Sequence, residues 1–421
     1  MGFGRLAAVL AGAWLGLAFA GAPCVATAQP SPPAGSAELF PALTGPYAVG
    51  VVDLAITDPS RREVFGPLPG GPRELGLVVW YPATRAEGRR SPIWRKPEVI
   101  LPAYAKAMGY PPAVADAFRS QQSHAYEAAP VARARRFPVI IFSHGYAQGF
   151  AAQNTALCED LASHGYVVVS IGHTYESFVS LLKDGKVAGA DTNQIKSFGD
   201  ELRTLATPLG TPTAAPLEQT DDVRLARQIA SGPIVDRSLD VWIKDTRFVV
   251  DQLPRLDRAG APAQLVGAMD TRQIIFIGMS FGGAVAPLAC AEDDRCKAAI
   301  NLDGDQFGHF KAPLAKPVLF MTRTDDRDDN YGVFGQAKGP AAYVVVPGSA
   351  HFDFTDLPLI THPGPPAKPG GPIEGRRMVA LVADFSRTFL DEVVKHDGEA
   401  RLADVKGRFP EVVMTVEGKL Q

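Results

Sequence analysis

The sequence predicts an α/β protein whose mostly parallel central sheet is covered by helices on both faces. Apolar runs typical of buried strands alternate with helical patterns along most of the chain. A glycine-flanked serine stands where one of these strands gives way to a helix. Polar residues that could assist this serine follow directly after later strands, where an open parallel sheet builds its site.

The expected strands are short runs rich in Val, Ile, Leu and Phe. The first two, residues 51–56 and 75–81, predict an antiparallel start to the sheet. The others predict its parallel part and cover residues 137–142, 167–171, 273–277, 297–302, 318–322 and 342–346.

The expected helices lie between these strands. A helix is predicted near residues 154–162, a second over 239–253, and a third over 283–290 directly after the serine. The last clear helix carries one apolar stripe with spacings of three and four, formed by Met378, Leu381, Val382, Phe385 and Phe389.

Composition narrows the class of protein. A net charge of −3 gives no electrostatic reason to expect nucleic acid as a partner. The 41 glycines and 36 prolines are more than average and indicate a globular chain rich in loops. No spacing of Cys or His suggests zinc, so we expect no metal and no cofactor.

The first residues resemble a secretory signal. Arg5 precedes an apolar run over residues 6–20, and Ala26-Thr27-Ala28 offers a cleavage site. We therefore expect residues 1–28 to be a signal peptide, residues 29–421 to form the mature domain, and the protein to be periplasmic or secreted. No later run is apolar for long enough to predict a transmembrane segment.

Cys290 and Cys296 lie close together in the sequence, and an oxidising compartment would preserve a disulfide between them. Such a bridge would join the end of the helix over residues 283–290 to the next strand, unless its geometry is forbidden. Cys158 falls in an amphipathic helix and is expected to be a small buried side chain.

The serine motif is Gly278-Met279-Ser280-Phe281-Gly282-Gly283. Gly-x-Ser-x-Gly at a strand-to-helix junction is the nucleophile elbow, in which a sharp turn exposes the serine hydroxyl. The alternative is a tight glycine-rich turn without chemistry. The strand before the motif and the helix after it favour a catalytic Ser280 and an α/β-hydrolase fold.

A nucleophilic serine needs a histidine oriented by a carboxylate. His351 follows the strand over 342–346 after a short turn, and it is the predicted base. Two acids compete, because Asp303 and Asp325 each follow a strand. Their spacing alone leaves the two nearly balanced.

The oxyanion hole of such a site is made of backbone N–H groups. Phe281, directly after the nucleophile, is the first expected donor. Tyr146 is the expected second, because Ser143-His144-Gly145-Tyr146 follows the strand over 137–142. His144 is expected to be structural.

Two segments do not fit the alternating pattern, and the first, residues 102–130, is expected to cover the sheet edge or line the pocket. The second, residues 174–235, is far longer than an ordinary connection, and loops of this length are often functional. Asp184-Gly185 within it is a hairpin-turn signal. We expect a cap-like insertion near the active site that includes a short β-ribbon.

The sequence resembles the platelet-activating factor acetylhydrolases of the plasma and intracellular type II kind and their bacterial relatives. The resembling pieces occur in one order: Thr44-Gly45-Pro46-Tyr47, Trp80-Tyr81-Pro82, Phe142-Ser143-His144-Gly145, Leu161-Ala162-Ser163-His164-Gly165-Tyr166, Asp251-Gln252-Leu253, the serine motif, Leu302-Asp303 and His351-Phe352-Asp353-Phe354. The resemblance implies Asp303 as the acid and leaves Asp325 as the reserve. Met279 stands where the family usually has histidine. Because the insertion is long, the resemblance does not extend to the family's substrate preference.

These observations predict a secreted serine carboxylic-ester hydrolase that works through an acyl-enzyme on short-acyl or phospholipid-like esters. Its partners would be small-molecule or lipid esters. The alternatives are a polyester or triglyceride hydrolase with the same catalytic residues and, less expected, a non-catalytic binding protein of the same fold.

Overall fold

The computed structural model describes residues 38–67, 69–107, 118–119, 121–206, 232–258, 262, 264–324, 327–361, 372–418 and 420. The predicted signal peptide, the reserve acid Asp325 and residues 207–231 of the predicted cap-like insertion lie outside these residues. These three expectations stay predictions.

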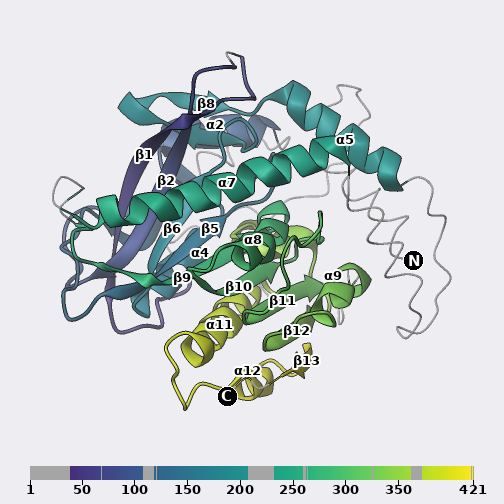
Figure 1. Ribbon diagram of the computed structural model, residues 1–421. Helices are drawn as coiled ribbons and strands as arrows, with labels where there is room; N and C mark the ends of the chain where they lie inside the picture. Colours follow the sequence, from purple (N-terminus) through teal and green to yellow (C-terminus); the bar gives the residue numbers. More distant parts are fainter. Residues whose placement is uncertain are drawn as a thin grey trace, which may run out of the picture.

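A mixed sheet forms the centre of the described chain (Figure 1). Its strand order is β13-β12-β11-β10-β9-β5-β6-β2-β1-β4-β3. The six strands from β12 to β6 are parallel to one another, which confirms the predicted sheet. Their bounds are β5 Phe137–Ser143, β6 Val167–Gly172, β9 Met269–Met279, β10 Cys296–Leu302, β11 Val318–Arg323 and β12 Ala341–Val346.

Successive residues of the central strands point to opposite faces of the sheet, and helices cover both faces. Val139 and Ile141 of β5 belong to one apolar core, whereas Ile140 and Phe142 belong to the other. The long α7 (Pro233–Leu256) and α8 (Phe281–Glu292) pack in the first core (Figure 1). The second contains α4 (Thr155–Ser163) and α11 (Gly375–Val393).

Both ends of the sheet contain antiparallel strand pairs, although β1 and β4 pair in parallel. β1 (Ala48–Arg62) pairs antiparallel with β2 (Pro72–Ala83), as the sequence predicts. Three further strands were not predicted: β3 (Arg90–Pro92), β4 (Gln122–Glu127) and the exposed β13 (Val413–Glu417). The remaining helices are α2 (Pro97–Ala107), α9 (Arg327–Phe334), α10 (Pro358–Thr361) and α12 (Leu402–Arg408), with a 3₁₀ turn η4 at His351–Phe354.

The described part of the insertion contains the predicted β-ribbon. β7 (Val179–Leu181) pairs antiparallel with β8 (Val187–Gly189), and the turn η1 (Lys183–Gly185) joins them. Asp184 and Gly185 both adopt positive φ angles there, of 58° and 75°, as the Asp-Gly signal implies. The helix α5 (Thr192–Ala206) follows the ribbon.

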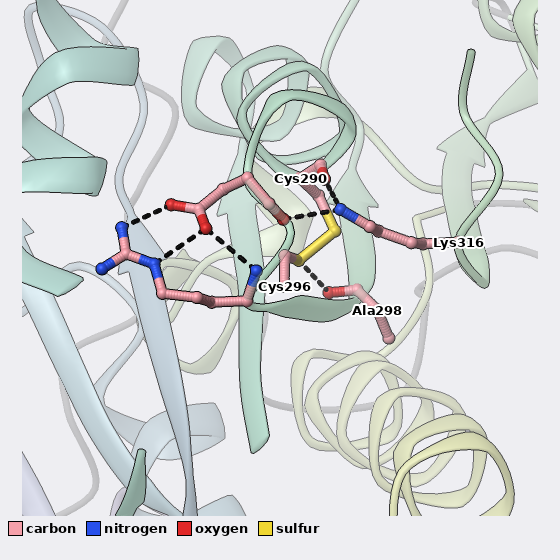
Figure 2. Close-up of a disulfide and its surroundings, with 6 residues drawn as sticks. Cys290, Cys296, Ala298 and Lys316 are labelled. Carbon is pink, nitrogen blue, oxygen red and sulfur yellow. Dashed lines mark hydrogen bonds and ion pairs between the residues drawn. A yellow bond between two sulfur atoms is a disulfide. The ribbon is translucent and has the colours of Figure 1, made fainter. Parts of the chain in front are cut away.

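Cys290 and Cys296 form a disulfide with their Cα atoms 5.2 Å apart, which confirms the predicted bridge (Figure 2). The bridge joins the last turn of α8 to the first residue of β10. The Nζ of Lys316 donates hydrogen bonds to the carbonyl oxygens of Cys290 and Asp293 beside it (Figure 2). The helix that begins after Ser280 is thus fixed at its far end.

Candidate active site

Ser280 lies at the sharp turn between β9 and α8. Its backbone has φ 56° and ψ −123°, a strained conformation for a residue with a side chain. Glycine is required on both sides of the turn: a Cβ on Gly278 would lie 2.0 Å from the carbonyl oxygen of Gly282. A Cβ on Gly282 would lie 2.2 Å from the carbonyl oxygen of Ser143. The predicted elbow geometry is therefore present.

The structure brings together the three residues predicted as nucleophile, base and acid. His351 Nε2 lies 2.9 Å from Ser280 Oγ, and His351 Nδ1 lies 2.6 Å from Asp303 Oδ2. Each residue stands at the carboxyl end of a parallel strand or just after it, on β9, β10 and β12. This is the chain of hydrogen bonds that a serine needs in order to lose its proton.

Asp303 is fully buried and is held by donors on both oxygens. Arg323 donates from its backbone N–H to Oδ1 at 2.8 Å and from its guanidinium to Oδ2 at 2.7 Å. Burial alone would raise the pKa of Asp303, but the charge of Arg323 and the hydrogen bond from His351 outweigh it and lower the pKa. Sequence reasoning missed Arg323, because no local pattern marks this residue, which precedes the competing acid Asp325 by two positions.

The predicted oxyanion loop, residues 143–146, lies against Ser280. A Cβ on Gly145 would be 3.3 Å from Ser280 Cβ, so the backbone of Gly145 closely approaches the serine. Tyr146 lines the same pocket as Ser280 and His351. Phe281, the other predicted donor, is the first residue of α8.

Residues 153–156 join the oxyanion loop to the loop that carries His351. Gln153 Oε1 accepts a hydrogen bond from the N–H of Gly145 at 2.9 Å. Asn154 Nδ2 donates to the carbonyl of Phe354 at 2.7 Å, and Asp356 Oδ2 accepts from the N–H of Thr155 at 2.6 Å. Sequence reasoning missed this junction, because its partners lie about 200 residues apart.

Glu159 places a buried carboxyl on α4 near this junction. Its Oε2 accepts hydrogen bonds from the backbone N–H groups of His124 and Ala125, at 2.9 Å and 3.2 Å. Its Oε1 has no hydrogen-bond partner among the residues that the structure describes. Burial raises the pKa of Glu159 well above its ordinary value, and the charge of nearby Asp356 acts in the same direction.

We therefore expect Glu159→Gln to remove a pH-dependent loss of stability. The folded protein holds the proton of Glu159 more tightly than the unfolded chain does. The protonated carboxyl therefore makes its full contribution to the free energy of unfolding below the unfolded pKa of about 4.5. That contribution is lost as the pH rises through the folded pKa, at up to about 1.4 kcal/mol per pH unit. Glutamine keeps a side-chain oxygen acceptor and cannot ionise. Urea unfolding should show the variant more stable than wild type at pH 8, with a smaller difference at pH 5.

The control is Glu417→Gln on the exposed strand β13, which should leave the pH dependence of unfolding unchanged. A difference between Glu159→Gln and wild type that stays constant from pH 5 to pH 8 would contradict the assignment of this titration to Glu159.

The pocket around Ser280 has aromatic walls. Trp94 and Tyr104 meet edge to face there with ring centroids 5.0 Å apart. A second lining pair, Tyr146 and Phe198, stacks with centroids 3.9 Å apart. Phe198 and its neighbour Ile195 come from α5, so the described part of the insertion contributes to the pocket.

Met279 occupies the position at which the resembling family usually has histidine. Its side chain is fully buried, and its Sδ lies 3.3 Å from Gln153 Nε2. The thioether also lies 3.3 Å from the position that a Cβ on Gly145 would take. The Met279 side chain therefore packs the turn at Ser280 against the loop at Gly145. The contact between Ser280 and His351 is present beside it.

Within the ranges that the structure describes, no group of three or more His, Cys, Asp or Glu side chains is arranged to hold a metal ion. No helix in those same ranges is long and apolar enough to cross a bilayer.

A family sequence model and two curated relatives carry the same family name. The sequence model of the family described as "Platelet-activating factor acetylhydrolase, isoform II" matches residues 34–197 and 245–396. The unmatched stretch between these ranges overlaps the predicted insertion.

Two curated relatives carry the name platelet-activating factor acetylhydrolase. The Cavia porcellus protein is 26% identical over 241 residues, which cover 55% of this chain and 51% of the relative. The Canis lupus familiaris protein is 24% identical over 343 residues, which cover 76% and 69%. The match therefore spans about half the length of the first relative.

Among solved structures, the fold is similar to that of a ferulic acid esterase from Streptomyces cinnamoneus. The TM-score is 0.61 at 26% sequence identity, and the match covers 89% of this chain and 98% of the other. The similarity therefore extends over nearly the whole fold of that esterase.

Proposed function

The chain belongs to the platelet-activating factor acetylhydrolase isoform II family, and from this premise we propose that it is a secreted serine carboxylic-ester hydrolase. The observation that carries the proposal is the continuous hydrogen-bonded line from Ser280 Oγ through His351 to Asp303. The names of the relatives and of the structural neighbour support ester hydrolysis as the reaction class.

In the proposed reaction, His351 Nε2 takes the hydroxyl proton of Ser280 as Oγ attacks the ester carbonyl carbon. The carbonyl oxygen becomes an oxyanion, for which the N–H groups of Tyr146 and Phe281 are the proposed donors. Asp303 keeps the proton of neutral His351 on Nδ1 and stabilises the imidazolium. The tetrahedral intermediate collapses, and His351 returns its proton to the departing alcohol.

The acyl-enzyme is then hydrolysed by the same groups. His351 removes a proton from water as the water oxygen attacks the acyl carbon, and a second tetrahedral intermediate forms. Its collapse breaks the bond to Ser280 Oγ, which recovers a proton from His351. This step releases the carboxylic acid and regenerates Ser280, so one ester and one water give one alcohol and one acid.

Export is part of the proposal. The N-terminal segment has the pattern of a signal peptide, and the Cys290–Cys296 bridge is of a kind that persists in oxidising compartments. We assign the protein to the periplasm or the medium on these two grounds.

The proposed substrates are short-acyl or phospholipid-like esters, and α5 is proposed to be part of a cap over the site. A second substrate class, esters of aromatic acids, is favoured by the two aromatic pairs that line the pocket and by the esterase that shares the fold. Aromatic acyl groups would pack against such walls in offset or edge-to-face contacts.

The test is hydrolysis of p-nitrophenyl esters from acetyl to palmitoyl, with p-nitrophenyl cinnamate as the aromatic member. We expect the highest kcat/KM for acetyl to butyryl esters. A maximum at cinnamate would move the proposal to aromatic esters. A maximum at long chains, or release of acids from an insoluble polyester, would favour the lipase-like or polyesterase alternative. Without turnover or labelling by a fluorophosphonate, the binding-protein alternative would replace the proposal.

A further inference from the structure

His144 holds the carbonyl group of the residue that follows it. Its Nδ1 lies 2.7 Å from the carbonyl oxygen of Gly145, and its side chain is fully buried. Building on the proposed function, we propose that His144 is a positioning residue that aims the N–H of Tyr146 at the reacting oxygen by holding the Gly145 carbonyl.

The link between the two groups is covalent. The carbonyl of Gly145 and the N–H of Tyr146 belong to one peptide plane, and a trans peptide points them in opposite directions. No cis peptide occurs in the described parts of the chain. A hydrogen bond that fixes the carbonyl on one side therefore fixes the direction of the amide hydrogen on the other.

Glycine at position 145 makes this control necessary. The residue has no Cβ to limit its backbone, and a Cβ there would make tight contacts of 3.3 Å with Ser280 and Met279. A freely rotating peptide at this point would lose the preorganised direction that makes an oxyanion donor effective. The imidazole of His144 supplies the restraint that a side chain at position 145 cannot.

The tautomer of His144 is fixed by its other nitrogen. The backbone N–H of His173 points at His144 Nε2 from 3.2 Å, and a backbone N–H can only donate. Nε2 is therefore unprotonated, and the proton lies on Nδ1, where it can bond to Gly145. Burial, helped by the neighbouring His173, lowers the pKa of His144 to about 3, so the imidazole stays neutral at working pH.

His173 is held in turn by a buried ionic group. Its Nδ1 lies 3.0 Å from Asp245 Oδ2, and its ring stacks on Trp242 with centroids 3.7 Å apart. Arg73 binds both carboxylate oxygens of Asp245, at 3.1 Å and 2.7 Å. The carboxylate is ionised because the charge of Arg73 outweighs burial and lowers the pKa of Asp245. The Nδ1 of His173 therefore carries a proton.

The same histidine anchors the residue before His144. His173 Nε2 lies 3.1 Å from Ser143 Oγ, and the serine hydroxyl donates to it, since burial lowers the pKa of His173 to about 4. Ser143, His173 and Asp245 thus form a second Ser-His-Asp line. All three side chains are buried, with 3%, 0% and 0% exposure, so no substrate reaches this serine. The line holds the end of β5 in place and performs no hydrolysis.

Other contacts fix the rest of the loop independently of His144. The N–H of Gly145 donates to Gln153, the hydroxyl of Tyr146 donates to Glu176 at 2.7 Å, and the N–H of Ala147 donates to the carbonyl of Glu176 at 2.8 Å. What His144 adds is the orientation of the single peptide between residues 145 and 146. Its loss should therefore affect the transition state more than the binding of substrate.

Two variants separate the two nitrogens of the imidazole. In His144→Asn the side-chain amide occupies the position of Nδ1 and can still donate to the Gly145 carbonyl. In His144→Gln the amide reaches the position of Nε2, so it keeps an acceptor for the N–H of His173 and loses the donor to Gly145. We expect His144→Gln to lower kcat about 100-fold with KM changed less than threefold, because losing one oxyanion donor costs about 10²–10³ in kcat. His144→Asn should stay within about fivefold of wild type.

A trifluoromethyl ketone gives a second readout, since it forms a tetrahedral oxyanion on Ser280. Its Ki should weaken by the same factor as kcat/KM in His144→Gln. If His144 had only a structural role, both variants would lose kcat to a similar extent, or KM would rise. The inference is overturned if His144→Gln unfolds at the temperature of wild type and keeps kcat within twofold. It is also overturned if the two variants lose kcat equally.

The wild-type protein provides a readout that needs no variant. Imidazole ¹⁵N spectra should show His144 with a protonated Nδ1 and a bare Nε2 from pH 5 to pH 9. The opposite tautomer, or an imidazolium, would overturn the inference. Wild-type protein without Ser280-dependent ester turnover would overturn the proposed function and this inference with it, whereas unchanged kcat in His144→Gln overturns this inference alone.

Discussion

Ser280→Ala is expected to lower kcat for the best p-nitrophenyl ester by about 10⁶-fold. The variant removes the oxygen that forms the acyl-enzyme, and no other described serine faces the pocket beside His351. The residual rate would come from the oxyanion donors and from substrate positioning, which together leave about 10³–10⁴-fold over water in comparable serine enzymes. The measurement is steady-state kinetics with a fluorophosphonate probe, which should label wild type and leave the variant unlabelled.

The matched control for this variant is Ser386→Ala on α11. Ser386 is fully buried, and its hydroxyl has no hydrogen-bond partner within the described chain, so its removal should leave kcat and labelling unchanged. Ser280→Ala should also keep the thermal unfolding temperature of wild type or raise it, because the elbow is strained. More than about 1% of wild-type kcat in Ser280→Ala would refute the assignment of the nucleophile.

Asp303→Asn is expected to lower kcat by about 10⁴-fold. The carboxylate is bound only by donors: the N–H of Arg323 and the hydroxyl of Thr322 contact Oδ1, whereas His351 and the Arg323 guanidinium contact Oδ2. An asparagine must therefore turn its NH₂ toward one set of donors, whichever way it is oriented. If the NH₂ faces His351, the imidazole is driven to the tautomer with its proton on Nε2, which cannot accept the proton of Ser280.

The control for the acid is Asp325→Asn, which should keep kcat within about twofold of wild type. The thermal unfolding temperature of Asp303→Asn should fall as well, because the variant leaves buried donors of Arg323 without an anionic partner. If Asp303→Asn loses less than tenfold while Asp325→Asn is inactive, the acid is Asp325 and the assignment made from the geometry is wrong.

The residues of the candidate site were predictable because they depend on local signals. A glycine-flanked serine after an apolar run, an aspartate after the next strand and a histidine after a later one all belong to strands whose carboxyl ends meet at one edge. The spacing alone did not separate Asp303 from Asp325. In the fold, Asp303 Oδ2 lies 2.6 Å from His351 Nδ1, whereas Asp325 lies outside the described residues.

The contacts around the site were not predictable in the same way. Arg73 and Asp245 are separated by 172 positions, and Asn154 and Phe354 by 200. Such pairs leave no periodic pattern in one sequence. The edge strands were missed for a different reason: β13 is largely exposed and β3 has only three residues, so neither shows the buried alternation that identifies a strand.

The disulfide has a consequence for the order of events when the chain folds under oxidising conditions. Three cysteines lie beyond residue 28, and Cys158 remains a free thiol within α4. Its pairing with either of the others would close a loop of about 130 residues, whereas Cys290 and Cys296 are 6 residues apart. Loop-closure entropy grows with loop length and favours the short ring by about 100-fold in an unstructured chain. The native pair is thus also the pair that random encounter joins most often, so the native disulfide can form first without isomerisation of a non-native one.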